Sequence, residues 1–343
     1  MDTIIIEPAT LAGEVCVPSS KSMGHREIIC AALAEGTSVI DNISLSADIK
    51  ATCHALRALG TEINPVASSY PGRTAFRVEG GRLKVASAKI DCGESGSTLR
   101  FMIPLAALCS EKVEFSGRGK LVSRPLKAYY DIFDRQGIVY ETADEGHLPL
   151  KVTGPLMPGS FELPGNVSSQ FVSGLLFALP LLEGDSVITI KSPLESKSYV
   201  ALTLSCLTKY GIEIKHEDYR VYRIRGGQKY HSKNSVVEGD YSQAAFWLVA
   251  GAIGGTVACK GLTADSLQGD KAIIDIMQAM AGKIVADGEA MSIVSSPAPT
   301  KATIIDASDC PDIIPILTVL AAVSEGTTEI VNAGRLRIKE CDR

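Results

Sequence analysis

Apolar and polar positions form a pattern that recurs five times along the chain: an apolar helical stretch, a small turn and a short β-branched strand. The copies occupy residues 31–43, 106–117, 180–190, 250–261 and 321–333. Their central strand positions serve as markers and are Val39, Val113, Val187, Val257 and Ile330. Consecutive markers are 74, 74, 70 and 73 residues apart. Because solenoid repeats are about 20–50 residues long, this longer period predicts a small α/β subdomain that has been duplicated.

A second helix is predicted after each of the first four markers. Its apolar residues are spaced four and three apart, which places them on one helical face. They are Ile49, Cys53 and Leu56; Leu126, Tyr130 and Phe133; Val200, Leu204 and Leu207; and Ile273, Met277 and Met280. Each helix is expected to end at a glycine suited to a C-terminal cap, namely Gly60, Gly137, Gly211 and Gly282. A strand follows, such as 61–63 or 212–214, so the unit is helix, strand, helix, strand.

The repeat also predicts the domain organisation. At roughly 150 residues per domain, 343 residues indicate two domains. If subdomains pack in threes, residues 20–237 form a first domain of three complete units, and residues 1–19 with 238–343 form the second. The fifth copy supplies a helix and a strand over 312–333, and the period puts the next marker near position ~403. We therefore expect the second domain to be incomplete.

Composition narrows the class of protein. Lysine and arginine number 34 against 39 acidic residues, a net charge of −5, which argues against a general nucleic-acid binder. Hydrophobic residues at 45% are enough for a sizeable core, and no apolar run reaches the ~18 residues of a membrane span. The start of the chain has an acid where a signal peptide carries positive charge. Nine cysteines without a Cys-x-x-Cys pair indicate reduced thiols, and so the cytoplasm.

The first helix of every copy begins in a polar segment. These segments are 19–22, 93–98, 167–170, 240–243 and 309–312. Unpaired N–H groups and the helix dipole favour phosphate at such places, although ordinary N-capping is an equally good interpretation of each one. Arg26 and Arg100 follow one turn into the first two helices, and Arg124 precedes a later one. Several capped helix starts with nearby cations favour a site for more than one phosphate, or for phosphate together with carboxylate.

Two other features have alternative interpretations. Residues 335–343 alternate apolar and charged positions, which is also typical of a solvated edge strand. Asp312, directly after Pro311, is equally well explained as an acid at a helix N-terminus. The five histidines lack metal-ligand spacing, and the sequence has neither a Walker loop nor a Gly-x-Gly-x-x-Gly motif after a strand. No metal, ATP or dinucleotide cofactor is therefore predicted.

Taken in order, eight motifs resemble those of the 5-enolpyruvylshikimate-3-phosphate (EPSP) synthase family, also called 3-phosphoshikimate 1-carboxyvinyltransferases. They are PSSKSMGHR (18–26), GESGSTLR (93–100), SRP (123–125), VSSQ (167–170), ESKSY (195–199), EGD (238–240), PD (311–312) and RIKECDR (337–343). The resemblance covers the whole chain. It implies an α/β fold of two domains, an inverse barrel of repeated βαβαββ units with three units per domain and helix N-termini facing a cleft.

The resemblance implies transfer of the enolpyruvyl group of phosphoenolpyruvate to the 5-hydroxyl of shikimate 3-phosphate, on the route to chorismate and the aromatic amino acids. The residues implied for shikimate 3-phosphate are Lys21, Ser22, Arg26, Ser168, Ser169, Gln170, Ser196, Tyr199, Asp312 and Lys339. Those implied for phosphoenolpyruvate are Lys21, Gly96, Arg124, Gln170 and Arg343. Asp312 and Glu340 are the implied proton-transfer groups, with Lys21 beside them. The implied enzyme is a cytoplasmic monomer without a cofactor, and it is inhibited by glyphosate.

Three departures from the family pattern bear on these expectations. Glu94 stands where the family often has asparagine, and Ser198 replaces the usual proline before Tyr199. The family also has a stretch beyond the position of Arg343 that supplies an arginine and a lysine to phosphoenolpyruvate. We therefore expect this chain by itself to bind shikimate 3-phosphate weakly and to have little transferase activity.

Two other functions are considered as alternatives. UDP-N-acetylglucosamine 1-carboxyvinyltransferase is built on the same repeat, but it would have Lys-Asn where this chain has Lys21 and Ser22, and a cysteine in the loop near 118–120. A non-catalytic phosphate-binding protein would keep the first anion site without turnover. Phosphate release together with binding of shikimate 3-phosphate separates the second alternative from the enzyme.

Overall fold

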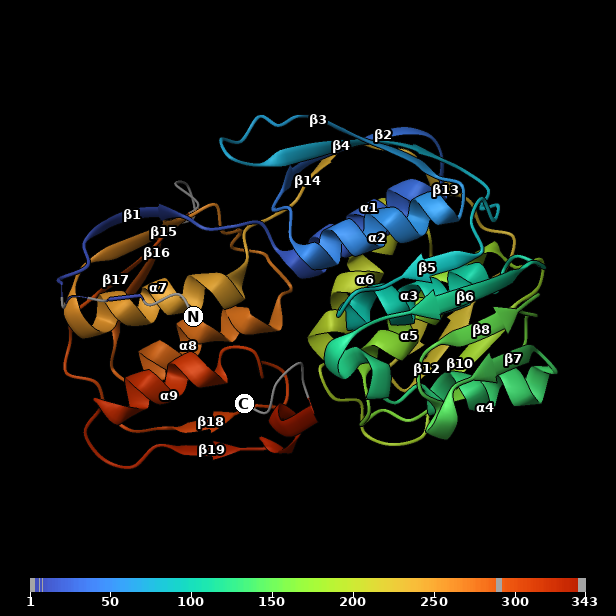
Figure 1. Ribbon diagram of the computed structural model, residues 1–343. Coiled ribbons are helices and arrows are strands. Elements are labelled where there is room, and N and C mark those ends of the chain that lie inside the picture. Colours follow the sequence, from blue (N-terminus) through green and yellow to red (C-terminus); the bar gives the residue numbers. More distant parts are fainter. Residues whose placement is uncertain (1–3, 6, 8, 288–291, 339–343) are drawn as a thin grey trace. The chain divides into compact units, whose positions relative to one another are not determined.

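The computed structural model describes residues 4, 5, 7, 9–287 and 292–338. The chain divides into two compact units, one comprising Ser19–Val237 and the other Met1–Pro18 with Glu238–Arg343 (Figure 1). Each unit has its own hydrophobic core. Within the described residues, no helix combines the length and the apolar character needed to cross a membrane.

The Ser19–Val237 unit contains three subdomains with the same order of elements. The first consists of α1 (Lys21–Leu33), β2 (Ala34–Ile43), α2 (Ala47–Ala58), β3 (Glu62–Ala67) and β4 (Thr74–Gly80). The second consists of β5 (Lys89–Asp91), α3 (Gly96–Ala106), β6 (Lys112–Ser116), α4 (Lys127–Gln136), β7 (Val139–Thr142) and β8 (Leu150–Thr153). The third consists of β9 (Ser160–Leu163), α5 (Ser169–Ala178), β10 (Ser186–Ile190), α6 (Lys197–Lys209), β11 (Ile214–Glu217) and β12 (Val221–Ile224).

The other unit continues the same series. Its first subdomain consists of α7 (Tyr241–Gly254), β15 (Val257–Lys260), α8 (Ile273–Ala279), β16 (Lys283–Asp287) and β17 (Ser292–Ser296). It is followed by β18 (Ile304–Asp306), α9 (Ile314–Ala322) and β19 (Glu329–Val331). All five marker residues lie in the predicted strands, β2, β6, β10, β15 and β19. The predicted repeat is therefore confirmed over the described residues.

The sheets also repeat one topology. The strand orders are β5-β6-β8-β7, β9-β10-β12-β11 and β1-β15-β17-β16, where β1 is Gly13–Cys16. In each sheet the first two strands are parallel and the other neighbours are antiparallel. In the first subdomain, β13 (Tyr230–His231) and β14 (Ser235–Val236) run parallel to β2 and occupy the position of the leading strand. In the last, β18 pairs with β19 in parallel.

Two leading strands are exchanged in the order of the sequence: each pairs within its own unit, but the chain leads from it directly into the other unit. The strand β1 pairs with β15, so that Gly13 lies opposite Val257, although 244 positions separate the two in the sequence. The strands β13 and β14 directly precede α7 but pair with β2, with Tyr230 opposite Ala34. Each unit therefore completes a sheet with chain that lies next to the other unit in the sequence.

The predicted apolar faces of the second helices point into the two cores. Leu56, Phe133, Leu207 and Met277 are among the buried residues of these faces, while Leu204 is only half-buried. Burying a side chain of this size contributes about 1.5–3 kcal/mol, so each face ties its helix to the sheet beneath it.

The predicted helix ends are correct at three positions and wrong at one. Gly60, Gly137 and Gly211 have positive φ and follow α2, α4 and α6. After α8, however, Ala281 and not Gly282 takes the left-handed conformation, with φ of 59°. The reason is that the chain turns one residue earlier, and the Gly282 N–H then bonds to the Met277 carbonyl at 2.8 Å.

Two strand predictions also need correction. Of the predicted strand 212–214, only Ile214 belongs to a strand. The Ile212 N–H instead donates a hydrogen bond to the Leu207 carbonyl of α6, at 3.0 Å. The edge strand considered for 335–343 is a short 3₁₀ helix, Gly334–Ile338, over its described part. Leu336 of that helix packs into the core of its unit.

Candidate active site

Side-chain caps begin four of the five first helices, as the capping interpretation predicts. The acceptor oxygens bond to backbone N–H groups two or three residues later: Ser20 to Met23 at 3.4 Å, Ser95 to Thr98 at 3.1 Å, Ser168 to Gln170 at 3.3 Å and Asp240 to Gln243 at 3.0 Å. The fifth helix, α9, begins after Ile313 and has no side-chain cap. One cap satisfies only part of a first turn, so the capping and phosphate-binding interpretations are compatible.

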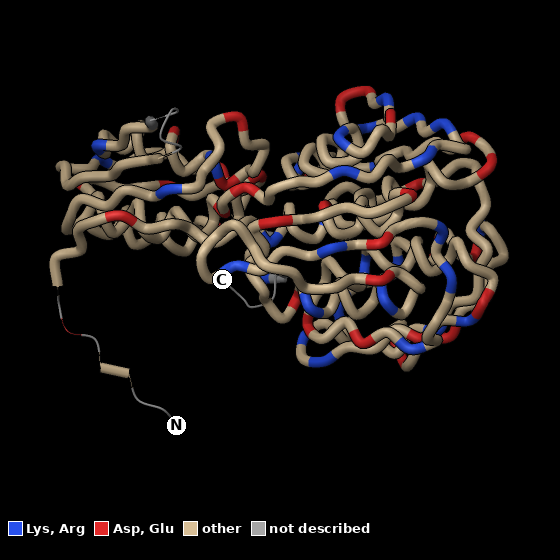
Figure 2. Tube along the Cα trace, turned by 90° about the horizontal axis from the view of Figure 1, so that it is seen from above, with Lys and Arg blue, Asp and Glu red and all other residues tan. Residues whose placement is uncertain are grey.

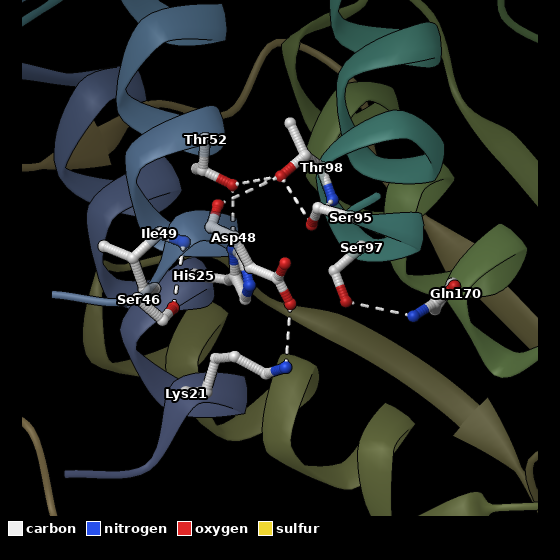
Figure 3. A network of polar contacts seen from close by, with 10 residues as sticks. All are labelled: Lys21, His25, Ser46, Asp48, Ile49, Thr52, Ser95, Ser97, Thr98 and Gln170. Carbon is white, nitrogen blue, oxygen red and sulfur yellow. Dashed lines mark hydrogen bonds and ion pairs between the residues drawn. The ribbon is translucent and has the colours of Figure 1, made fainter. Parts of the chain in front are cut away.

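Lys21 is the first residue of α1 and reaches across to α2. Its Nζ lies 2.7 Å from Oδ2 of Asp48, the second residue of α2 (Figure 3). The backbone carbonyl of Asp48 in turn accepts a hydrogen bond from Oγ1 of Thr98, in the first turn of α3, at 3.3 Å. The N-terminal turns of three helices are thereby connected through Asp48.

A second set of contacts joins buried polar side chains of α1, α2 and the start of α3. His25 Nδ1 lies 2.7 Å from Thr52 Oγ1, which lies 2.7 Å from Thr98 Oγ1 (Figure 3). Thr98 Oγ1 is also 2.8 Å from Ser95 Oγ. All four side chains belong to buried residues or to the buried face of α2. This chain of polar groups fixes α1, α2 and α3 against one another at the ends where ligand-binding residues are predicted.

The imidazole of His25 is neutral at physiological pH. Burial lowers the pKa of His25 to about 3, and the positive charges of Lys21 and Arg26 act in the same direction, with Asp48 opposing them. The ring therefore adds no cation next to Lys21, and its role here is to hold Thr52.

Arg26 connects α1 to α6. Each nitrogen of its guanidinium donates one hydrogen bond: Nε to Thr203 Oγ1 at 2.8 Å, Nη1 to the Ser22 carbonyl at 2.7 Å and Nη2 to the Tyr199 carbonyl at 2.8 Å. Burial lowers the pKa of Arg26 to about 10, so the group is still a cation at neutral pH. Ser196, the buried N-cap residue of α6, has φ of 55° in the same turn as Tyr199.

A third group of residues surrounds Gly96, the first residue of α3. Arg100 Nη1 donates to Gln170 Oε1 at 2.7 Å, and Gln170 Nε2 donates to Ser97 Oγ at 3.0 Å. A methyl group placed on Gly96 would lie 2.5 Å from Arg124 Nη1 and 3.4 Å from Gln170 Oε1. The structure thus brings together Gly96, Arg124 and Gln170, three of the residues predicted for phosphoenolpyruvate. Ser168 and Ser169 begin the same helix as Gln170.

The other predicted residues are not part of these groups. Asp312 belongs to the other unit and lies in the turn before α9, which begins at Ile314, two residues later than predicted. Lys339, Glu340 and Arg343 lie outside the described residues.

Sequence reasoning missed Asp48. Thr98 lies in the polar segment 93–98 that it singled out, but without an assigned role. Asp48 lies at the start of the second helix of the first copy, in a stretch that carries none of the eight motifs. A cue was present, because Ser46 caps α2 by accepting a bond from the Ile49 N–H at 3.2 Å, and an acid two residues after a serine cap is typical of a helix start.

The exposed side chain of Glu94 lies against the turn at Gly119. A methyl group on Gly119 would lie 3.1 Å from Glu94 Oε1. Glu94 and Arg118 line a pocket of about 520 Å³ together with β5 and residues 47–54 of α2. The acid that departs from the family pattern thus lines the same pocket as Arg118, whose Nη1 lies 3.8 Å from Asp91 Oδ2.

Charges of both signs are mixed in the Ser19–Val237 unit. Figure 2 shows its lysines and arginines interspersed with aspartates and glutamates along the trace. This distribution is unlike the basic stripe of a nucleic-acid-binding surface, and it suits a site in which a few cations meet a small anion.

Comparisons with known proteins bear on the family and on the fold. The model of the family described as EPSP synthase (3-phosphoshikimate 1-carboxyvinyltransferase) matches residues 5–343. A 3-phosphoshikimate 1-carboxyvinyltransferase of Clostridium novyi is 51% identical over 347 residues, and one of Clostridium acetobutylicum is 50% identical over 345. Each match covers all of this chain and 79% of the relative.

Solved structures confirm the predicted two-domain α/β fold of enolpyruvyl transferase type. EPSP synthase from Acinetobacter baumannii superposes with a TM-score of 0.79 at 26% identity, covering 97% of this chain and 76% of the other. The enolpyruvyl transferase NikO from Streptomyces tendae has a TM-score of 0.70 at 18% identity, covering 94% of this chain and 75% of the other, and supports the fold alone. The matched family model and the relatives at half identity confirm the predicted family: the chain belongs to the EPSP synthase family, the 3-phosphoshikimate 1-carboxyvinyltransferases.

Proposed function

We propose that the chain transfers the enolpyruvyl group of phosphoenolpyruvate to the 5-hydroxyl of shikimate 3-phosphate, giving 5-enolpyruvylshikimate 3-phosphate and phosphate. The product leads to chorismate and the aromatic amino acids. The observation that carries the proposal is the convergence of Arg124, Gln170 and the open position at Gly96 in a member of the EPSP synthase family. The same family match and relatives favour this reaction over the UDP-N-acetylglucosamine enzyme and the non-catalytic protein.

The shikimate 3-phosphate site is proposed on the N-terminal turns of α1, α5 and α6. The residues are Lys21, Ser22, Arg26, Ser168, Ser169, Gln170, Ser196 and Tyr199, with Asp312 and Lys339 from the other unit. Helix N-termini and serine hydroxyls donate hydrogen bonds to phosphate, and Lys21 supplies positive charge. Arg26 has five N–H donors and uses three of them within the protein, so its planar fork can also bind an anion.

Phosphoenolpyruvate is proposed to bind beside it, at Lys21, Gly96, Arg124, Gln170 and Arg343. Two anionic substrates repel each other, so the cations that bind them also allow them to approach to reacting distance. Lys21 belongs to both groups and is proposed to lie between the two anions.

Proton transfer is proposed for Asp312 and Glu340. One carboxylate takes the proton of the 5-hydroxyl, and the other acid protonates the methylene carbon of phosphoenolpyruvate, which makes the neighbouring carbon electrophilic. The hydroxyl oxygen bonds to that carbon. Loss of phosphate and of one methyl proton then restores the double bond, so that the enolpyruvyl group ends on the 5-oxygen.

The Ser19–Val237 unit is proposed as the shikimate 3-phosphate side, and the Glu238–Arg343 unit as the source of Asp312, Lys339, Glu340 and Arg343. We further propose that the enzyme acts as a cytoplasmic monomer. The eight cysteines of the described residues are all free thiols, and burial raises the pKa of several of them, including Cys53 to about 11. Protonated, buried thiols are suited to a reducing compartment.

Phosphate release tests the proposal. The purified chain is mixed with both substrates, and phosphate is measured with either substrate omitted as a control. Binding of shikimate 3-phosphate is measured in parallel by calorimetry. Phosphate release that requires both substrates supports the enzyme. Binding without turnover, both in this chain and in a form extended beyond Arg343, supports the phosphate-binding alternative, and absence of both contradicts the proposed function.

A further inference from the structure

We infer that Asp48 is a positioning residue for Lys21: its carboxylate holds the lysine ammonium at the first turn of α3 before the substrates bind. The inference rests on the proposed function, because Lys21 is proposed to contact both anions. It starts from the 2.7 Å ion pair between Lys21 Nζ and Asp48 Oδ2 (Figure 3).

The ion pair is too exposed to be explained by stability. The side chain of Lys21 is 53% exposed and that of Asp48 is 29% exposed. Pairs exposed to solvent typically contribute little to stability, because holding a long lysine side chain in one geometry costs conformational entropy. The pair does restrict the Lys21 ammonium to one place before the substrates bind. A binding group that is already ordered no longer loses conformational entropy in the binding step.

The backbone that carries the Asp48 carboxylate is held in place from two directions. Its helix is fixed at the N-terminus by the Ser46 cap, and its backbone carbonyl accepts a bond from Thr98 Oγ1 at 3.3 Å. Thr98 is fully buried and is two residues from Gly96. Asp48 therefore connects the Lys21 ammonium to the first turn of α3, where Gly96 and Ser97 lie.

A different role for Asp48 must be separated from this one. An acid in the first turn also stabilises its own helix through the helix dipole. Asp275 in the first turn of α8 is such an acid, it is exposed, and it belongs to the other unit. Asp275→Asn is therefore the matched control for the dipole effect.

The positioning role predicts a distinct split between kcat and KM. Asp48→Asn keeps the size of the side chain and removes its charge, so the ammonium is no longer restrained and kcat should fall about tenfold. KM for both substrates should stay within about twofold, because removing a negative charge next to two anions offsets the lost order of Lys21. Asp48→Glu keeps the charge and should recover most of kcat, and Asp275→Asn should leave kcat unchanged.

A double-mutant cycle tests whether Asp48 acts through Lys21. In the Lys21→Ala background, Asp48→Asn should lower kcat by less than about twofold, because the group that it positions is already missing. Equal losses in both backgrounds would overturn the inference, and so would a wild-type kcat for Asp48→Asn. A lower melting temperature that accounts for the whole loss would assign Asp48 to the stability of α2 instead.

A measurement without turnover separates this inference from the proposed function. The order parameter of the Lys21 ammonium is measured by NMR relaxation on protein with ¹⁵N-labelled lysine, without substrates. The wild type should show an ordered Lys21 and Asp48→Asn a mobile one, whether or not the chain releases phosphate. A Lys21 that is equally mobile in both proteins would refute the positioning role, and absence of phosphate release by the wild type would contradict only the proposed function.

Discussion

The guanidinium of Arg124 lies where a side chain at position 96 would begin: Nη1 is 2.5 Å from the point that a Cβ on Gly96 would occupy. Arg100 Nη1 and Gln170 Oε1 lie 3.3 and 3.4 Å from the same point. Three polar groups from different segments therefore share one small space, and only glycine leaves it open. Because Arg124 approaches with the far end of a flexible side chain, the fold can accommodate a methyl group that the ligand site cannot.

Gly96→Ala should therefore change ligand binding and leave stability almost unchanged. We expect KM for phosphoenolpyruvate to rise about tenfold or more, because the Arg124 guanidinium must move, and glyphosate inhibition to be relieved. Steady-state kinetics with and without glyphosate check this. Gly254→Ala is the control, because a methyl group there meets open space. Equal glyphosate inhibition of the wild type and Gly96→Ala would contradict the prediction.

Lys21→Ala should weaken binding of shikimate 3-phosphate by about an order of magnitude or more, since a charge-assisted contact contributes about 1.5–3 kcal/mol. Calorimetry measures the loss. Lys127→Ala removes another exposed lysine, paired with Asp131 four residues on, and should bind normally. Unchanged affinity of Lys21→Ala would exclude Lys21 from the anion site.

Replacing either proposed proton-transfer group by its amide should reduce turnover about 10²–10⁴-fold. The changes are Asp312→Asn and Glu340→Gln, measured by phosphate release in an active form of the enzyme. Binding of shikimate 3-phosphate should be largely preserved, because the contacts on α1, α5 and α6 are unchanged. A near-normal rate for either variant would remove that residue from the mechanism.

His25 should make the protein less stable in acid. Its folded pKa of about 3 is below its ordinary value of 6.5, so its contribution to stability is complete above pH 6.5 and is lost as the pH falls toward 3. The slope in that window is about 1.4 kcal/mol per pH unit. Between pH 6.5 and 4.5, the free energy of unfolding of His25→Gln, measured with urea, should therefore fall by about 2 kcal/mol less than that of the wild type.

Overall stability of His25→Gln at pH 8 is expected to be lower than that of the wild type, because the packing and the contact with Thr52 are altered. His54→Gln serves as the control, since His54 is exposed on α2. If His25→Gln and the wild type show parallel pH profiles, the buried imidazole is not responsible for the acid sensitivity.

The Ser19–Val237 segment should fold by itself and bind shikimate 3-phosphate. It contains β13 and β14, which complete the sheet of its first subdomain, and it has a core of its own. A single cooperative thermal transition and calorimetric binding of the ligand are the expected results. A segment that lacks cooperative unfolding would contradict the division into independent units.

Local patterns in the sequence predicted the repeat well because they depend on neighbouring residues. The spacing of Leu126, Tyr130 and Phe133 predicts one buried face of α4, and all three are buried. The exchange of β1 and β13 has no such local signature, since Gly13 pairs with Val257. The contact between Lys21 and Asp48 crosses 27 positions and depends on how α1 packs on α2, which the periodicity of either helix leaves open.

The exchanged strand β1 sets an order for biosynthesis. Among the described residues β1 pairs with β15 alone, and Gly13 precedes its partner Val257 by 244 positions, so β1 leaves the ribosome long before the sheet that it joins has been made. The Ser19–Val237 unit can finish its sheets in that interval. The other unit must then recruit a strand that was made before the Ser19–Val237 unit, so a deletion of β1 would be felt by a sheet whose other strands are made after that unit.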